Sequence, residues 1–422
     1  MDGDTAVAPD FDPRTPEAVR DPYAALKPLQ DAAPVWWSDR LGAWCVTRYA
    51  DIRAAFRDPR LSADRIRPFI AQAAPALRNT VGQLGDHLEH WAVFTDPPDH
   101  TRLRGLMNKA FTARAVEALR PNIAAIVDDL LDAVETDLGA RGARAFDFTA
   151  AVAYPLPATV IADMLGVPRQ DVDRLKDWSD RLAKFVLTSR ADPDRYRLAA
   201  EGIAEMEVYF RDFLDSPPSG GHAGVTAGLI DARDAGDRLT PDELVANCVL
   251  LLFAGHETTT QLLANGLLAL LRNPDQMADL RANLDDADLV RNAVEEMLRF
   301  DGPALSSVRV VAEDFEWHDA RLRRGDRVFL FQCSGNRDPR AFADPDRFDI
   351  RRADAKANIG FGYGIHFCLG APLARLEAEI AFPRILRRFP DLELAEPDPA
   401  WSDSILTRGM LALNVRVKEI SN

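Results

Sequence analysis

The chain has 422 residues, of which 47% are hydrophobic, and a formal net charge of −15 at pH 7. A length above about 250–300 residues exceeds the usual limit for one hydrophobic core, so two lobes or an internal cofactor are expected. The negative charge disfavours phosphate backbones and anionic membranes, and we expect neither a nucleic-acid partner nor a membrane. The longest strongly apolar run, CVLLLFAG, is too short to span a bilayer.

Four cysteines lie far apart in the sequence, at Cys45, Cys248, Cys333 and Cys368. Their spacing fits neither a secreted disulfide framework nor a zinc site built from close cysteine pairs. The N-terminal segment is acidic and rich in proline, and it lacks the basic and apolar regions of a signal peptide. A reducing, cytoplasmic setting is therefore expected.

The predicted elements are mainly helical, with a minor β part near the N-terminus. The segment APVWWSDRLGAWCVTRY predicts a hairpin with its turn at Ser38 to Gly42. From Asp96 onward most segments have helical periodicity, including RAVEALRPNIAAIVDDLLDAVETDL and AEGIAEMEVYFRDFLD. Two segments rich in proline, near 216–224 and 338–349, predict loops on one folded body.

The most informative helix is predicted from Thr240 to about Arg272. TPDE supplies an N-cap threonine, a proline in the first turn and a glutamate three residues on, as in a capping box. Such a helix is about 50 Å long and would cross the molecule. At its centre, AGHETTT places two ionisable groups and three threonines where a buried helix prefers alanine and leucine. Back-bonding by these hydroxyls is expected to loosen the helix and open a groove. The stretch is either a tolerated polar patch or a notch for a small ligand or protons.

A second unusual stretch is FGYGIHFCLG, Phe361 to Gly370, directly before the predicted helix APLARLEAEI. A thiolate at the first turn of a helix is stabilised by the macrodipole, which is expected to lower the pKa of Cys368 and favour metal binding. Gly362, Gly364 and Gly370 would let the backbone approach a flat ligand and adopt conformations closed to other residues. The alternatives are a glycine-rich turn around a small buried cysteine, a zinc site with His366, or a nucleophilic cysteine.

These motifs together resemble those of bacterial soluble members of the cytochrome P-450 superfamily, the haem-thiolate monooxygenases. FGYGIHFCLG resembles the haem-binding loop, and AGHETT resembles the oxygen-activating segment of the long central helix. EEML with Arg299, FADPDRF and DPPDHTRLR resemble the Glu-x-x-Arg helix, the meander and the start of a haem-flanking helix. The resemblance implies a mainly α fold with a minor β part and a long central helix over the haem.

The resemblance also implies a single catalytic domain over 1–422. It would have a β-rich part at about 30–60, a helical body at about 96–300 and the haem-binding loop at 361–370. Asn358 stands where many relatives have histidine, which leaves one haem-side contact open.

Roles for individual residues follow from the resemblance. Cys368 would ligate the iron of haem b, and Phe361 would cover its sulfur. The other implied haem contacts are His100, Arg104, Arg309, His366, Gly362 and Gly370. Thr258 and Glu257 would be catalytic, since cleavage of the O–O bond needs an alcohol and an acid that deliver protons. The implied structural triad that supports the haem loop is Glu296, Arg299 and Arg347.

The implied reaction inserts one oxygen atom of O2 into a C–H bond of a lipophilic small molecule. Electrons would come from NAD(P)H through a separate iron–sulfur ferredoxin and its reductase, because no such domain follows the haem loop. The expected docking patch consists of Arg102, Lys109 and Arg114. The expected substrate-pocket residues are Leu250, Phe253, Ala254 and Leu305, with Phe185 and Leu187 as roof candidates. A haem-binding sensor and a peroxide-using haem-thiolate enzyme remain as alternatives, although peroxygenases typically lack the acid–alcohol pair.

Overall fold

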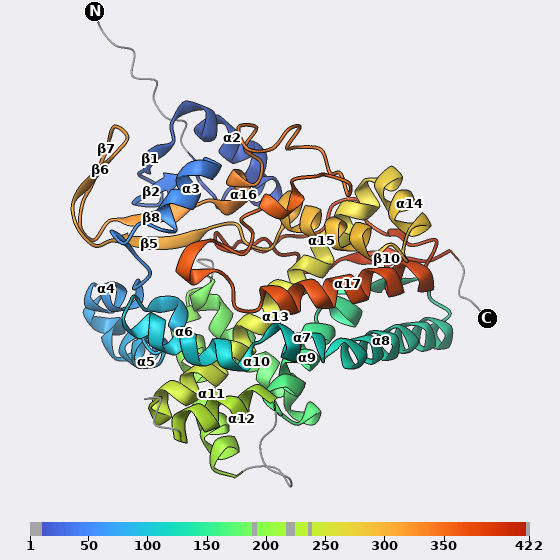
Figure 1. Cartoon of the computed structure of the whole chain (residues 1–422), viewed down its shortest axis with the longest axis horizontal. Helices are drawn as coiled ribbons and strands as arrows, with labels where there is room; N and C mark the ends of the chain where they lie inside the picture. The colour runs from blue at the N-terminus through green and yellow to red at the C-terminus, as the bar shows by residue number, and fades with distance from the viewer. Residues whose placement is uncertain (1–10, 188–191, 217–223, 235–238, 419–422) are drawn as a thin grey trace, which may run out of the picture.

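The computed structural model describes residues 11–187, 192–216, 224–234 and 239–418, and it is mainly α with a minor β part (Figure 1). The α-helices up to the middle of the chain are α1 (Pro16–Arg20), α2 (Pro22–Ala32), α3 (Tyr49–Ala55), α4 (Ile66–Ala71), α5 (Arg78–Leu88), α6 (Asp99–Ala110), α7 (Ala113–Glu117), α8 (Arg120–Arg141), α9 (Pro155–Leu165), α10 (Val172–Val186) and α11 (Arg195–Asp215). The later α-helices are α12 (Gly224–Asp234), α13 (Pro241–Arg272), α14 (Pro274–Ala282), α15 (Ala287–Asp301), α16 (Gln332–Gly335) and α17 (Ala371–Arg388).

The strands form small sheets, which Figure 1 shows gathered mainly at one end of the molecule. The strands are β1 (Val35–Ser38), β2 (Ala43–Val46), β3 (Leu61–Ser62), β4 (Ala145–Asp147), β5 (Ser307–Val311), β6 (Phe315–Trp317), β7 (Ala320–Leu322), β8 (Arg327–Leu330), β9 (Glu393–Leu394) and β10 (Asn414–Arg416). The largest sheet has the order β1-β2-β8-β5-β3. The predicted hairpin is confirmed, because β1 and β2 pair antiparallel with Val35 opposite Val46. The sheet then brings the hairpin beside β8, which pairs in parallel with β2.

The long helix α13 begins as the sequence predicts. The Thr240 side chain accepts a hydrogen bond from the Glu243 N–H at 3.1 Å, and the Glu243 carboxylate accepts one from the Thr240 N–H at 2.9 Å. This capping box satisfies backbone donors that the first turn leaves unpaired. The expected loosening at the helix centre is wrong, since α13 continues without a break from Pro241 to Arg272. Thr260 does bond back to the His256 carbonyl at 2.9 Å, but the helix accommodates this contact.

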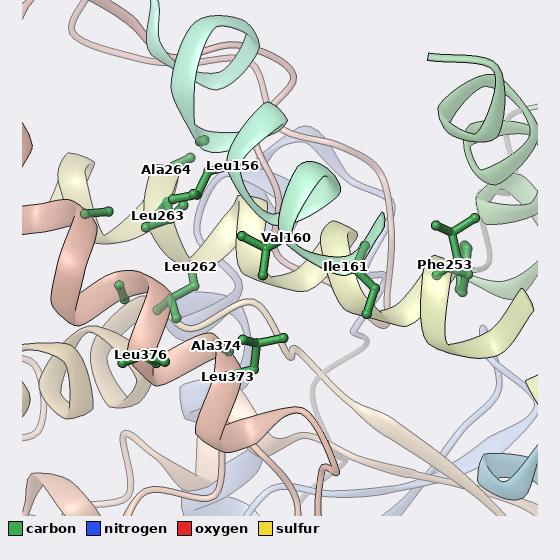
Figure 2. Packing of buried hydrophobic residues seen from close by; sticks show 14 of the residues in the cluster. Leu156, Val160, Ile161, Phe253, Leu262, Leu263, Ala264, Leu373, Ala374 and Leu376 are labelled. Atoms are coloured by element: carbon green, nitrogen blue, oxygen red, sulfur yellow. The ribbon is translucent and has the colours of Figure 1, made fainter. Parts of the chain in front are cut away.

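Apolar side chains surround most of α13, and such a helix has to be buried. Figure 2 shows side chains of α9 and of α17 packed on opposite sides of it, among them Val160 and Leu373. Gly255 explains how closely α9 approaches, because a Cβ at this position would lie 2.7 Å from Cγ1 of Ile161. Gly255 is therefore required for packing, because only a residue without a side chain lets the polar centre of α13 lie this close to α9.

One predicted helix is divided in the structure, and one predicted loop is confirmed. RAVEALRPNIAAIVDDLLDAVETDL forms two helices, α7 and α8, rather than one. The segment 338–349 contains no helix or strand, as predicted, whereas most of 216–224 lies outside the described residues. Among the described residues, no helix is both long and apolar enough to cross a membrane.

Candidate functional site

The loop before α17 presents the sulfur of Cys368. The Cys368 N–H donates to the Phe361 carbonyl at 3.0 Å, which closes the loop. The sulfur accepts hydrogen bonds from the backbone N–H groups of Gly370 and Ala371 at the start of α17. Cys368 is exposed, whereas Cys45, Cys248 and Cys333 are buried. A single accessible sulfur, aimed by the loop and by a helix N-terminus, is an arrangement that suits a metal ligand.

The glycines of this loop do not all serve the same purpose. Gly362 and Gly364 have φ of +75° and +74°, a left-handed conformation that favours glycine. Gly370 has a φ of −78°, which any residue adopts, so the expected conformational reason is wrong for this position. A Cβ at Gly370 would lie 3.9 Å from the Cys368 sulfur, an ordinary contact distance.

The surrounding protein changes the pKa of the Cys368 thiol. Burial raises the pKa of the Cys368 thiol, and this outweighs the Gly370 N–H and the Arg104 charge, which both lower it. The expectation of a lowered pKa is therefore wrong for the protein alone. A bound metal cation would reverse the balance, because it deprotonates a coordinating thiol.

A cluster of nitrogen-bearing side chains surrounds the loop on one side. The rings of His100 on α6 and His366 lie 4.1 Å apart between their centroids. Burial, and secondarily the charge of Arg309, lowers the pKa of His366 to about 3. Burial and the charge of Arg104 likewise lower the pKa of His100. Both histidines are therefore neutral near pH 7, mainly because burial disfavours a charged ring and also because neighbouring guanidinium groups are positive.

The two guanidinium groups of this cluster make no ion pair among the described residues. Arg104 donates to the Asn108 side-chain oxygen at 3.1 Å, and Arg309 donates to the Val308 carbonyl at 2.9 Å. Burial lowers the pKa of Arg309 to about 10 and also lowers the pKa of Arg104. Partly desolvated cations without a carboxylate partner suit a ligand that carries carboxylates of its own.

The middle of α13 is accessible although most of the helix is buried. Ala254 and Thr258, one turn apart, are exposed, and Glu257 is half-buried. Burial raises the pKa of Glu257, while the neighbouring His256 lowers it. His256 is buried, donates from Nδ1 to the Leu252 carbonyl at 2.9 Å, and places Nε2 3.7 Å from Glu257 Oε1. A carboxyl group with a raised pKa thus lies next to an accessible alcohol.

The expected pocket residues do not all meet at this place. Leu250 and Phe253 are buried on α13, and the Phe253 ring lies 5.7 Å from that of Trp91 between centroids. Leu305 packs instead with the core cluster of the N-terminal sheet, which includes Phe331. Of the roof candidates, Phe185 lies in the last turn of α10, and Leu187 is the C-cap residue of that helix.

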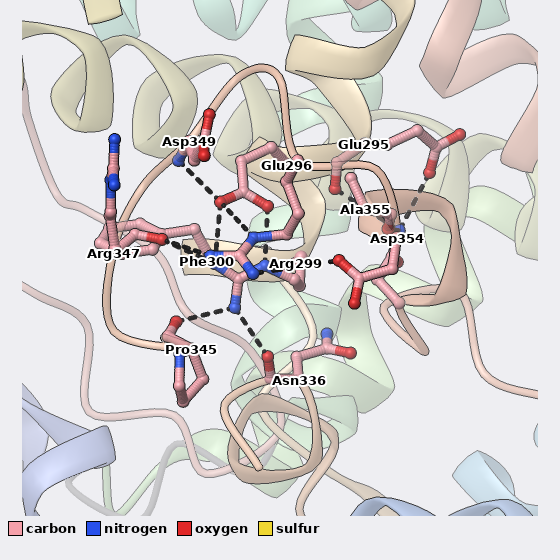
Figure 3. A network of polar contacts seen from close by, with 12 residues as sticks. Glu295, Glu296, Arg299, Phe300, Asn336, Pro345, Arg347, Asp349, Asp354 and Ala355 are labelled. Atoms are coloured by element: carbon pink, nitrogen blue, oxygen red, sulfur yellow. Dashed lines mark hydrogen bonds and ion pairs between the residues drawn. The ribbon is translucent and has the colours of Figure 1, made fainter. Parts of the chain in front are cut away.

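A buried ion-pair cluster joins α15 to the segment 336–352 (Figure 3). Arg299 donates from Nε and Nη2 to both carboxylate oxygens of Glu296, at 2.7 and 2.8 Å. The expectation that the Arg347 side chain completes this pair is wrong, because Arg347 is exposed and contributes its carbonyl, which accepts from Arg299 at 3.1 Å. The second cation is Arg352, whose Nε donates to Glu296 at 3.2 Å. The meander motif did indicate the right segment, but it named the wrong side chain.

Asn358 has a clear structural role. Its side-chain amide donates to the Glu295 carboxylate at 2.9 Å, and the same carboxylate accepts from Arg375 Nε at 2.7 Å. The Arg375 guanidinium lies 4.6 Å from the centroid of the Phe361 ring. Asn358 therefore ties the loop to α15 and, through Glu295, to α17. Glu295 and Arg375 are not among the residues expected from the sequence, although the doubled glutamate of EEML was a signal.

The three residues of the expected basic patch differ in their surroundings. Arg102 donates from Nη1 to the Glu243 carboxylate at 3.0 Å, so it ties α6 to the capping box of α13. Lys109 and Arg114 are exposed. Arg102 is thus part of the internal framework rather than of a docking surface.

Comparisons with known proteins agree with this geometry. A family model described as Cytochrome P450 matches residues 222–407. The chain is 41% identical to cytochrome P450 107B1 of Saccharopolyspora erythraea, over 89% of this chain and 89% of that protein. It is 40% identical to the cytochrome P450 monooxygenase PikC of Streptomyces venezuelae, over 93% of this chain and 90% of that protein. The solved structure of the myxobacterial cytochrome P450 CYP267B1 in complex with myristic acid is similar, with 38% identity, a TM-score of 0.84, and coverage of 96% of this chain and 99% of that one.

The chain therefore belongs to the cytochrome P450 family, and it is an oxidoreductase of the monooxygenase type. Vitamin D(3) 25-hydroxylase of Pseudonocardia autotrophica is a further relative, 39% identical over 93% of this chain and 92% of that protein. The family implies a haem iron, O2 and electrons derived from NAD(P)H. The accessible Cys368 sulfur and the cations without carboxylate partners fit a haem with its iron and its two carboxylates.

Proposed function

We propose that this protein inserts one oxygen atom of O2 into a C–H bond of a lipophilic small molecule, with haem b as its cofactor. The observation that carries the proposal is the Cys368 sulfur, which is accessible and held by two backbone N–H groups. It lies near the Arg104 guanidinium, which makes no ion pair among the described residues. A thiolate-ligated haem supplies the iron chemistry that activates O2. We also propose that residues 1–422 form one catalytic domain that acts in the cytoplasm, in keeping with free cysteines at all four positions.

The proposed cofactor contacts divide into two groups. Cys368 would ligate the iron, while Phe361, Gly362 and Gly370 would form the wall around the sulfur. The carboxylates would be held by His100, Arg104, Arg309 and His366. Two neutral histidines can donate hydrogen bonds, and two guanidinium groups bring charge, so this set offers each carboxylate both kinds of partner.

Glu257 and Thr258 are the proposed catalytic residues. Thr258 would hold O2 through its accessible hydroxyl, and Glu257 would take up protons from solvent and pass them on. Burial raises the pKa of Glu257, so this carboxyl keeps its proton to higher pH than an exposed glutamate does. Buried His256 lies beside it and limits this shift.

The electrons would come from NAD(P)H by way of an iron–sulfur ferredoxin and its reductase. Exposed Lys109 and Arg114 near the start of α7 would offer positive charge to an acidic surface of such a partner, on a protein that is itself acidic. Arg102 is left out of this proposal because it pairs with Glu243.

A carbon monoxide difference spectrum of the dithionite-reduced protein tests the proposal. We expect a strongly red-shifted Soret band in the wild type, loss of that band in Cys368→Ser and its retention in the control Cys333→Ala. Absence of the band from folded wild-type protein that contains haem would overturn the proposal, since Cys368 would then not be the iron ligand.

A further inference from the structure

A groove with a volume of about 590 Å³ lies among α4, α5, the end of α10, the start of α11, and strands β5 and β8. Three aromatic rings form one of its walls. The centroids of Phe69 and Phe185 are 5.5 Å apart, and Tyr196 lies 6.1 Å from the first and 5.7 Å from the second. An aromatic wall of this kind suits the apolar body of a ligand.

The charged side chains in the groove are mainly cationic. They are Arg65, Arg195, Arg327 and Asp326. The one carboxylate among these four already accepts hydrogen bonds from the Trp44 indole N–H and from the Arg323 N–H, both at 2.9 Å. A positive groove in a protein with a net charge of −15 selects for an anionic ligand.

Arg65 differs from the other two arginines of the groove in its lack of polar contacts among the described residues. Among the residues that the structure describes, its guanidinium makes neither an ion pair nor a hydrogen bond, and it lies 4.7 Å from the centroid of the Phe94 ring. Burial, and next the charge of Arg309, lowers the pKa of Arg65 to about 10, so the group remains charged near pH 7. A desolvated guanidinium without a counter-charge is costly, and a bound carboxylate would offset that cost through two parallel hydrogen bonds.

The haem is a less suitable source of this carboxylate than a second ligand. The four side chains proposed for the haem carboxylates already provide donors for both, and Arg65 lines the groove instead. A row of packed aromatic rings connects the wall of the groove to α13, the helix that carries the proposed oxygen site. Phe94 stacks on Trp91 with 5.7 Å between ring centroids, and Trp91 lies 5.7 Å from Phe253, which precedes Thr258 on α13 by little more than one turn.

We infer that the groove binds the substrate and that this substrate is a lipophilic carboxylic acid, whose carboxylate pairs with Arg65 and whose apolar part packs on the aromatic wall. This inference rests on the proposed function and names its substrate class. Arg195 and Arg327 add to the positive potential, but they donate to the carbonyls of Asp192 and Leu41 at 3.1 and 2.9 Å and are therefore less available.

The test compares tetradecanoic acid with its methyl ester on the haem-loaded protein. Binding is followed by the spin-state shift of the Soret band and, independently of the haem, by isothermal titration calorimetry. We expect the wild type to bind the acid at least about tenfold more tightly than the ester, and Arg65→Gln to lose this preference while its affinity for the ester stays within about twofold. Arg67→Gln is the matched control, since Arg67 is exposed and pairs with Asp64 at 3.2 Å.

Three outcomes would overturn the inference. These are equal affinities for acid and ester in the wild type, an acid preference that survives in Arg65→Gln, and loss of haem from Arg65→Gln with the acid preference retained in the haem-loaded fraction. The last outcome would assign the Arg65 guanidinium to a haem carboxylate. The carbon monoxide spectrum of the same preparations separates this inference from the proposed function, because an acid preference measured by calorimetry without the red-shifted band would support the carboxylate site and refute the haem-thiolate proposal.

Discussion

Replacing Glu296 with glutamine keeps the shape of a fully buried side chain and removes its charge. The two cations that it neutralises, Arg299 and Arg352, are 1% and 8% exposed. Among the described residues, Arg299 would be left in the interior without a carboxylate and Arg352 with only that of Asp354, 3.9 Å away. Breaking a buried ion pair in this way costs about 3–5 kcal/mol. The loop that carries Asp349 would also be affected, because the Asp349 N–H donates to Glu296 at 2.9 Å. We therefore expect Glu296→Gln to lower the free energy of unfolding by about 3–5 kcal/mol.

Two further variants separate the roles of the arginines. Arg352→Ala removes a guanidinium that donates to Glu296 and to the carbonyls of Ala343 and Asp344, so a loss of at least about 2 kcal/mol is expected. Arg347→Ala keeps the backbone carbonyl that accepts from Arg299, and its effect should stay within about 0.5 kcal/mol. Urea unfolding followed by far-ultraviolet circular dichroism, on preparations of matched haem content, measures all three losses.

The losses for Arg347→Ala and Arg352→Ala together show which arginine side chain neutralises Glu296. A loss for Arg347→Ala as large as that for Arg352→Ala would refute the reasoning, because the charge of Arg347 would then support the cluster. A loss of less than about 1 kcal/mol for Glu296→Gln would show that the ion pair does not stabilise this region as its burial implies.

Three other predictions concern the reaction, the pH dependence of stability and the redox partner. Thr258→Ala should divert reducing equivalents from product to hydrogen peroxide, measured as peroxide formed per NAD(P)H consumed, while the buried neighbour in Thr260→Ser should leave that ratio unchanged; equal ratios in wild type and Thr258→Ala would contradict the assigned role. Glu377 is fully buried with no hydrogen-bond partner among the described residues, and burial raises its pKa well above the ordinary 4.5. The native state then holds a proton that the unfolded state releases, so relative to Glu377→Gln the wild type should lose up to about 1.4 kcal/mol of stability per pH unit as the pH rises above that ordinary value; parallel stability curves would contradict this. Lys109→Glu combined with Arg114→Glu should slow ferredoxin-dependent reduction at least about fivefold at low salt, measured by stopped-flow absorbance. Arg324→Glu, in the exposed turn between β7 and β8, should leave the rate unchanged. An unchanged rate in the Lys109 and Arg114 double variant would remove these residues from the docking surface.

The sequence by itself determined those features that depend on neighbouring residues. The start of α13 at Thr240 and the hairpin of β1 and β2 follow from capping and turn chemistry within a few positions. The loop around Cys368 and the acid–alcohol pair at Glu257 and Thr258 were found for the same reason, since each is a short run of unusual residue types. Such features can be predicted from the sequence because the residues that interact lie within a few positions of one another.

The tertiary structure decided which distant groups meet. Arg102 on α6 pairs with Glu243 in the first turn of α13, and Arg352 rather than Arg347 approaches Glu296 on α15. The fold brings these charges together from segments that are far apart in the sequence. No period or motif encodes such a pairing, since many arginines in the sequence could serve. The net pKa of Cys368 was likewise beyond the sequence, because desolvation depends on how much protein surrounds the sulfur. The cationic groove with Arg65 is assembled from segments that are far apart in the chain, and its charge follows from which side chains the fold leaves without a partner.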